Sequence, residues 1–138
     1  MNPKLRNILS ILAAIILGSF VNMGIITLGG RLIPPPDGAD LTTMEGLRAS
    51  IHLLQPKHFM IPLFAHALGT FASGLAVSFL AASHKREFAL GVAAFFLLGG
   101  VMNSFTLPAP VWFIVSDLTL AYLPMGVLAE RLVARRSA

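Results

Sequence analysis

Four polar residues interrupt the long apolar runs of this 138-residue chain, and their side chains could bind a solute or carry a proton. They are Asn22, His66, Asn103 and Asp117. A carboxylate beside an imidazole can hold or exchange one proton near neutral pH, because burial disfavours the charged form of each group and mutual pairing favours it. Amide side chains can complete a hydrogen-bonding ring around a water, an ion or a polar headgroup. The four residues therefore predict a polar site if the fold brings them together.

The apolar runs that must position these residues are long enough to be membrane spans. The chain is 56% hydrophobic and 12% charged, with a mean hydropathy of +0.80. A helix of about twenty apolar residues crosses roughly 30 Å of hydrocarbon. We therefore predict an all-α polytopic membrane protein, a four-helix transmembrane bundle that forms a single membrane domain over residues 1–138. The predicted spans are 8–30, 59–82, 88–107 and 111–129.

Residues 31–57 form the only long loop, which the topology places outside the cytoplasm. Thr42-Thr-Met-Glu45 has capping-box spacing, and apolar residues follow it on one helical face up to Pro56. This pattern predicts a short amphipathic helix in the first extracytoplasmic loop. Its apolar face would rest on the bundle or on lipid, or it would cover a cavity as a lid.

Basic residues favour one side of the predicted bundle. Seven lie at span ends that share a side, whereas the opposite loop has three basic residues offset by three acidic ones. Because cytoplasmic loops carry an excess of Lys and Arg, we predict a bacterial inner-membrane protein with both termini in the cytoplasm. The net charge of +4 then reflects topology, and we expect no nucleic-acid partner. The seven are Lys4, Arg6, Lys85, Arg86, Arg131, Arg135 and Arg136.

The four polar residues are expected at one depth in the bilayer. At about 1.5 Å per residue, Asn22 and Asn103 lie roughly 20 Å above the inner edges of their spans. By the same measure, His66 and Asp117 lie roughly 10 Å beneath the outer edges. In a core of about 30 Å these are the same level, in the outer half of the bilayer.

Small and polar residues accompany the candidate residues on the same helical faces. His66 is followed at intervals of four residues by Thr70, Gly74 and Ser78, so this face can approach another helix closely. Thr70 therefore joins the candidate site. The other predicted inward faces hold Ala14, Gly18 and Asn22 in the first span and Phe113, Asp117 and Ala121 in the fourth.

Leu-Gly-x-x-x-Asn occurs twice, at Leu17 to Asn22 and at Leu98 to Asn103. Two parallel helical hairpins would explain this repeat, as in transporters built from internal repeats, and chance in a Leu- and Gly-rich sequence explains it equally well. Pro62 and Pro124 are expected either to kink their spans or to lie near the span ends.

Several chemistries are not expected. Cysteine is absent, which excludes thiol redox chemistry and thiolate metal sites. The spacing of His52 and His58 matches no compact ligand motif, so we expect exposed histidines and no metal site. No nucleophile–base motif, phosphate loop or nucleotide fingerprint occurs, so neither a catalytic residue nor a cofactor is predicted.

Three strings resemble segments of small, uncharacterised bacterial proteins with four predicted transmembrane helices. They are Gln55-Pro-Lys-His58-Phe, Ala65-His-Ala-Leu-Gly-Thr70 and Leu107-Pro-Ala-Pro-Val-Trp-Phe113. The resemblance covers most of the chain. It implies the four-span fold and no assigned activity.

Our leading hypothesis is a non-enzymatic membrane protein that binds or transports a small polar or protonatable solute or a lipid headgroup. The ligand or proton site would consist of Asn22, His66, Thr70, Asn103 and Asp117. A second interpretation is an accessory or structural subunit whose polar layer only fixes helix packing. A third is a lipid-modifying enzyme with Asp117 and His66 as acid and base. Because four helices enclose little volume, we expect a homo-oligomer or a larger membrane complex within the lipid bilayer.

Overall fold

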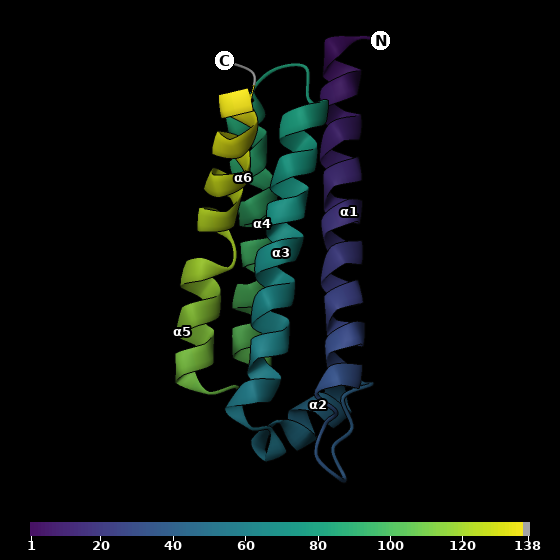
Figure 1. The fold of residues 1–138 in the computed structure, drawn as a ribbon, viewed down its shortest axis with the longest axis vertical. Coiled ribbons are helices and arrows are strands. Elements are labelled where there is room, and N and C mark those ends of the chain that lie inside the picture. The colour runs from purple at the N-terminus through teal and green to yellow at the C-terminus, as the bar shows by residue number, and fades with distance from the viewer. Residues whose placement is uncertain (137–138) are drawn as a thin grey trace.

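The computed structural model describes residues 1–136. Within this range the regular secondary structure is all helical, with no strand. Three long helices, α1 (Pro3–Leu32), α3 (Pro56–Leu80) and α4 (Lys85–Thr106), are followed by the shorter α5 (Val111–Leu120) and α6 (Leu123–Arg136) (Figure 1). With α5 and α6 counted together, four helices are long and apolar enough to cross a membrane. The predicted all-α fold with four helices long and apolar enough to span a membrane is confirmed.

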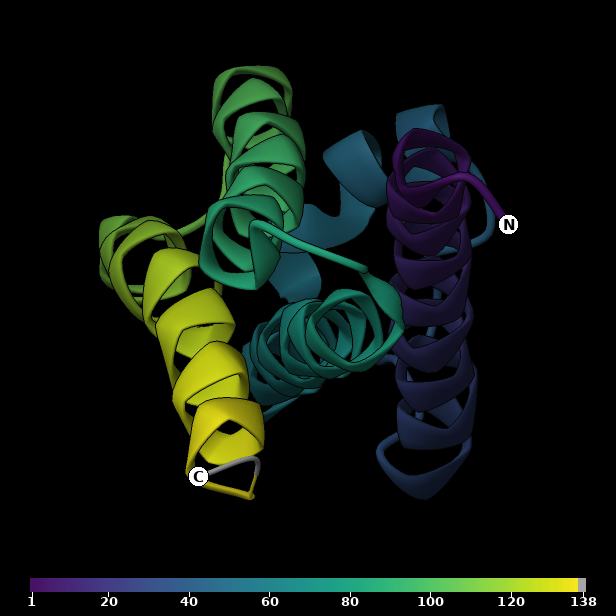
Figure 2. The same ribbon diagram turned by 90° about the horizontal axis from the view of Figure 1, so that it is seen from above.

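The helices form a bundle around α3. Helix α3 packs against α1, α4, α5 and α6. Helix α1 packs mainly against α3 and has few contacts with α4 (Figure 2). The start of α1 and the end of α6 lie at one end of the bundle and the 33–55 connection lies at the other (Figure 1). We call these the terminal end and the loop end. Helices α1 and α4 both run from the terminal end to the loop end.

Small residues bring the helices together in the half of the bundle nearer the terminal end. A Cβ added to Gly74 would lie 2.8 Å from Ala129, and one added to Gly126 would lie 2.8 Å from Ala93. The backbones of α3, α4 and α6 therefore touch almost directly, as is common where transmembrane helices pack. A hydrophobic core of Ala14, Val77, Ala81, Ala89 and Val92 completes this half.

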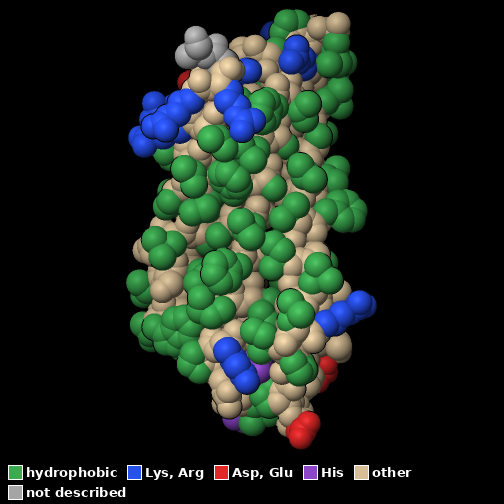
Figure 3. All heavy atoms as spheres, in the orientation of Figure 1, with side chains coloured by type: hydrophobic (Ala, Val, Ile, Leu, Met, Phe, Trp, Pro, Cys, Tyr) green, Lys and Arg blue, Asp and Glu red, His purple; other side chains and the backbone are tan. Residues whose placement is uncertain are grey.

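The outer surface is apolar along most of the bundle. Figure 3 shows hydrophobic side chains over the middle of the visible face, with Lys and Arg side chains near both ends. Large exposed residues such as Phe20, Leu98 and Phe105 contribute to this surface. A soluble protein rarely exposes so much contiguous apolar surface, whereas lipid solvates it. The surface is compatible with a multi-pass membrane protein.

The loop end carries a short helix, α2 (Met44–Ser50), followed by a 3₁₀ turn, Ile51–Leu53. The expected start at Thr42 is wrong by one residue: Thr43 is the N-cap, and its Oγ1 accepts the Gly46 N–H at 2.9 Å. Thr42 instead donates to Asp40, which lowers the pKa of that carboxyl below its ordinary value of 3.8. The Arg48 Nε donates to the Thr106 carbonyl at 2.9 Å, which ties α2 to the end of α4.

The fourth span is broken rather than merely kinked. Helix α5 ends at Leu120 and α6 begins at Leu123, with Pro124 in the first turn of α6. Proline has no N–H to donate to the preceding turn, so the helix cannot continue through this position unstrained. Pro62, by contrast, lies within an α3 that the structure shows as one helix.

Candidate functional site

Three side chains, from α3, from α5 and from the break between α5 and α6, meet in the loop half of the bundle. The His66 Nδ1 in α3 lies 2.7 Å from the Asp117 Oδ1 in α5. The Tyr122 hydroxyl, at the α5–α6 break, donates to the other carboxylate oxygen at 2.9 Å and lies 3.1 Å from the His66 Nδ1. The Asp117 side chain is 6% exposed and that of His66 is 19% exposed. The carboxylate is therefore buried and accepts on both oxygens.

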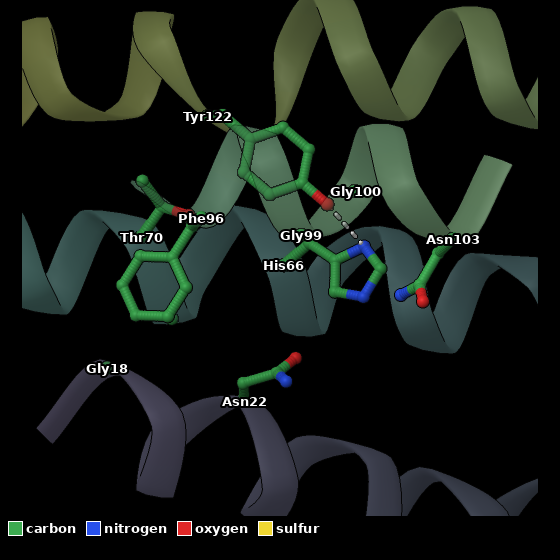
Figure 4. A pocket seen from close by; sticks show the side chains of 10 residues that line it. Gly18, Asn22, His66, Thr70, Phe96, Gly99, Gly100, Asn103 and Tyr122 are labelled. Carbon is green, nitrogen blue, oxygen red and sulfur yellow. Dashed lines mark hydrogen bonds between the residues drawn. The ribbon is translucent and has the colours of Figure 1, made fainter. Parts of the chain in front are cut away.

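This geometry fixes the tautomer of a neutral His66. A carboxylate accepts and does not donate, so the proton between His66 and Asp117 belongs to Nδ1. The second ring nitrogen, Nε2, then carries a lone pair. Figure 4 shows Nε2 on the side of the ring that faces Asn22 and Asn103. The arrangement presents an oriented hydrogen-bond acceptor, or a base, to the space between these helices.

That space is a cavity of about 170 Å³, which we call the polar cavity. Asn22 of α1, His66 and Thr70 of α3, Asn103 of α4 and Tyr122 line it, together with Phe96 and glycines (Figure 4). Asn103 and Gly99 are exposed, so the cavity reaches the surface of the molecule. Its lining includes residues of α1, α3 and α4, and α1 and α4 have few contacts with each other.

Two polar atoms of the lining are buried without a hydrogen-bond partner in the structure. They are the Oδ1 of Asn22 and the Oγ1 of Thr70. Thr70 is only 1% exposed as a residue. A buried hydroxyl or amide oxygen without a partner costs about 1–3 kcal/mol. Both atoms therefore favour a polar group, a water or a solute, within the polar cavity.

Glycine lets the tyrosine reach the carboxylate. A Cβ added to Gly100 would lie 2.5 Å from the Tyr122 hydroxyl oxygen and 2.8 Å from its Cζ. On α1, a Cβ at Gly18 would lie 2.7 Å from the Gly69 carbonyl. Any larger residue at either position would push a helix or a ring aside. The cavity wall thus depends on these two glycines.

A second cavity of about 210 Å³ adjoins the first, and we call it the apolar cavity. It lies at the loop end, where Leu47 of α2 and Ile51 form part of its lining with Phe59 and Phe113. His66, Gly100 and Asn103 line both cavities, and Asp117 lines the apolar one. The His66–Asp117 pair therefore lies between a strongly apolar space and one whose wall carries several polar side chains.

The structure brings most of the predicted site residues together. The expected contact between His66 and Asp117 is confirmed. Asn22, Thr70 and Asn103 line the polar cavity beside His66, although no hydrogen bond closes the expected ring. Both copies of the Leu-Gly-x-x-x-Asn string contribute to this cavity, through Gly18 and Asn22 in α1 and Gly99 and Asn103 in α4.

Two residues differ from expectation. Tyr122 belongs to the site but was not predicted, although it is the only tyrosine of the chain and lies two residues before Pro124. The expectation of an exposed His58 is wrong, since it is 7% exposed. Its Nδ1 accepts the Gln55 N–H at 3.0 Å, so its Nε2 donates to the Pro34 carbonyl at 3.1 Å. His58 thereby joins the loop to α3.

Comparisons with protein-family models, curated proteins and solved structures find no match to this chain. Within residues 1–136, no group of three or more His, Asp or Glu side chains is placed to hold a metal ion.

Proposed function

We propose that this chain is a non-enzymatic integral membrane protein that binds or transports a small polar or protonatable solute, or a lipid headgroup. The site consists of Asn22, His66, Thr70, Asn103 and Asp117, and Tyr122 completes it. The observation that carries the proposal is the orientation of His66: Asp117 holds its Nδ1, and Nε2 faces a cavity with unpartnered polar atoms. A solute that donates a hydrogen bond or a proton matches this acceptor.

The energetic argument supports binding over packing alone. A carboxylate in the apolar interior of a bilayer costs at least about 2.5 kcal/mol before pairing, so ionisable residues there are candidates for function by default. Contacts that merely join helices need neither a cavity nor unpartnered oxygens. Thr70 is the clearest case, because its buried hydroxyl has no hydrogen-bond partner and its side chain lines the polar cavity.

A structural role is the second candidate, and one observation favours it. The contacts of Asp117 with His66 and Tyr122 join α3, α5 and the α5–α6 break. In this role the chain is an accessory subunit, and the polar layer only fixes how its helices pack. The two roles differ in what a solute does to His66.

Nitrogen NMR of the histidine rings tests the proposal in the protein reconstituted in phosphatidylcholine nanodiscs. Of the four histidines, His66 is assigned by His66→Gln. We expect Nδ1–H and a bare Nε2, and we expect methylamine hydrochloride to shift the Nε2 resonance. We expect Thr70→Val to weaken that response. The control is Ser78→Ala, which also removes a buried unpartnered hydroxyl but lines neither cavity, and it should leave the response unchanged. If methylamine leaves the Nε2 resonance of His66 unchanged, the result supports the structural role instead.

We also propose a bacterial inner-membrane location with both termini in the cytoplasm, and assembly as a homo-oligomer or within a larger complex. The seven basic residues at the terminal end support this orientation. The loop end, with α2, then lies outside the cytoplasm, and the polar cavity lies in the outer half of the bilayer. Helix α2 acts there as an amphipathic cover, since Leu47 and Ile51 line the apolar cavity while Arg48 is exposed.

A further inference from the structure

We propose that the two cavities form one site for a single amphipathic molecule, with a head that donates hydrogen bonds to His66 and a short apolar chain. This inference rests on the proposed function and adds the class of ligand. Its basis is that the cavities share His66, Gly100 and Asn103 yet differ in the chemistry of their walls.

The apolar cavity has the size and lining for a hydrocarbon chain. Its volume of about 210 Å³ exceeds that of an engineered apolar cavity of about 150 Å³, which stays dry and binds benzene. Ile26, Leu47, Ile51, Phe59 and Phe113 are among its lining residues. An isolated polar solute gains nothing from these walls, whereas burial of a chain removes apolar surface from water.

The polar cavity selects the head. Its acceptors include the Oδ1 of Asn22, the Oγ1 of Thr70 and the Nε2 of His66, and the first two have no partner. Among residues 1–136, no Lys or Arg lines either cavity, and Asp117 is the only acidic residue that does. The other titratable groups of the lining are His58, His66 and Tyr122. An anionic head at His66 would lie close to the Asp117 carboxylate with no Lys or Arg to compensate, so a protonated amine is favoured over a carboxylate or phosphate.

The molecule also offers a route for such a ligand. Gly99 and Asn103 line the polar cavity and are exposed, and α1 and α4 have few contacts with each other, so the polar cavity is open to the side of the bundle. In a membrane that side faces lipid. At the loop end, α2 covers the apolar cavity, and Arg48 holds α2 to the end of α4. An amphipathic molecule dissolved in the bilayer therefore enters laterally.

The test compares three probes on the full chain in phosphatidylcholine nanodiscs at pH 7: methylamine, hexylamine and hexanoate. Equilibrium dialysis gives the amount bound, with empty nanodiscs subtracted, and the His66 Nε2 resonance reports binding at the site. Each pair of methylene groups that enters the apolar cavity tightens binding about tenfold. We therefore expect hexylamine to bind at least tenfold more tightly than methylamine, and hexanoate not to displace it.

Two matched variants test whether the alkyl chain of the ligand binds in the apolar cavity. Ala109 lines the apolar cavity, and Ala109→Phe fills part of it; Val111→Phe adds an aromatic ring at an exposed position nearby and serves as the control. Ala109→Phe should remove the tenfold advantage of hexylamine without changing the binding of methylamine. Val111→Phe should leave both unchanged.

The outcomes separate the two proposals. If methylamine binds and shifts His66 but hexylamine gains nothing, or Ala109→Phe leaves the gain intact, the amphipathic ligand is wrong and the proposed function stands. If hexanoate binds as tightly as hexylamine, the donor head is wrong. If neither amine reaches His66, both proposals fail.

Discussion

The two halves of this bundle are built from similar residues and use them differently. Near the terminal end, Gly74 and Gly126 bring helices into direct backbone contact, and the space between the helices is filled. Gly100 in the loop half and Gly18 at the middle of α1 also permit close approach, but they do so beside the polar cavity. The comparison indicates that the first half holds the bundle together and the second half keeps a space open. Stability and binding should therefore respond to different substitutions.

The largest loss of stability is expected from Gly126→Val in the close-packed half. The added Cβ would lie 2.8 Å from Ala93 and 3.0 Å from the Ala89 carbonyl, where neither neighbour can move away easily. We expect a loss of about 3 kcal/mol, at the upper end for overpacked sites, measured by unfolding in mixed micelles. Gly91→Val in α4 has open space around it and should unfold like the wild type. Equal stability of the two variants would contradict the close packing.

The next largest loss is expected from Asp117→Ala in the loop half. It leaves the His66 Nδ1–H and the Tyr122 hydroxyl without their shared acceptor, at a cost of about 2 kcal/mol. The triple variant Asp117→Leu, His66→Leu, Tyr122→Phe removes all three polar groups together and should recover most of this loss. Thermal unfolding at pH 7 measures both. No loss in the single variant would show that these contacts do not form.

A smaller loss is expected from Gly100→Ala, which separates Tyr122 from the carboxylate. The new methyl group would lie 2.5 Å from the Tyr122 hydroxyl oxygen, so the ring must turn away. We expect the free energy of unfolding to fall by about 1 kcal/mol, because water can partly replace the lost hydrogen bond from the Tyr122 hydroxyl to the carboxylate. The chemical shift of the Tyr122 hydroxyl-bearing carbon should move toward that of an unbonded phenol. If the chemical shift is the same in Gly100→Ala and in the wild type, the Tyr122 hydroxyl does not lie against Gly100 as described.

Almost no loss of stability is expected from Thr70→Val, although binding should weaken. The buried Oγ1 has no partner, and valine has nearly the same shape, so stability should change by less than about 0.5 kcal/mol or rise. Methylamine binding should fall several-fold, as followed at the His66 ring nitrogen. A variant that unfolds easily would instead reveal a structural hydrogen bond to this hydroxyl.

The smallest effect is expected in the loop itself and depends on pH. Hydrogen bonds from Thr42 lower the pKa of Asp40, so the carboxylate stabilises the loop above its ordinary pKa of 3.8. That stabilisation is lost as the pH falls through the lower pKa of the folded state. The Thr42 amide resonance should therefore shift below pH 3.8 and stay constant from pH 5 to 8. In Asp40→Asn the acid shift should be absent.

Helix positions were predictable because they follow from long apolar runs, and the inward faces followed from spacing. Ala14, Gly18, Thr70 and Asp117 are all buried as the four-residue intervals predicted. The pairing of His66 with Asp117 followed from depth and from the cost of a lone charge in hydrocarbon. These features depend on regular helix geometry, which a sequence specifies directly.

Tyr122 was not predictable by the same means, because the helix is broken between it and Asp117. On a continuous helix, residues five apart point about 140° away from each other, so Tyr122 would face away from the carboxylate. The break before Pro124 turns the tyrosine back toward Asp117. His58 was missed for a related reason, since its partners are the loop backbone at Pro34 and Gln55. Helical spacing in the sequence gives no information about hydrogen bonds to the backbone of a loop.

The division of the fourth span into α5 and α6 has a consequence for how the protein is made. Helix α5 has ten residues, about 15 Å of helix, which is too short to cross the hydrocarbon by itself. It carries Asp117, and in a bilayer it would cross only together with α6. By then the ribosome has already delivered α3, with His66 in place to receive the carboxylate. Because His66 is synthesised first, it can pair with the buried Asp117 carboxylate as soon as that residue follows. We therefore expect a chain that lacks His66 to insert its fourth predicted span, α5 with α6, poorly.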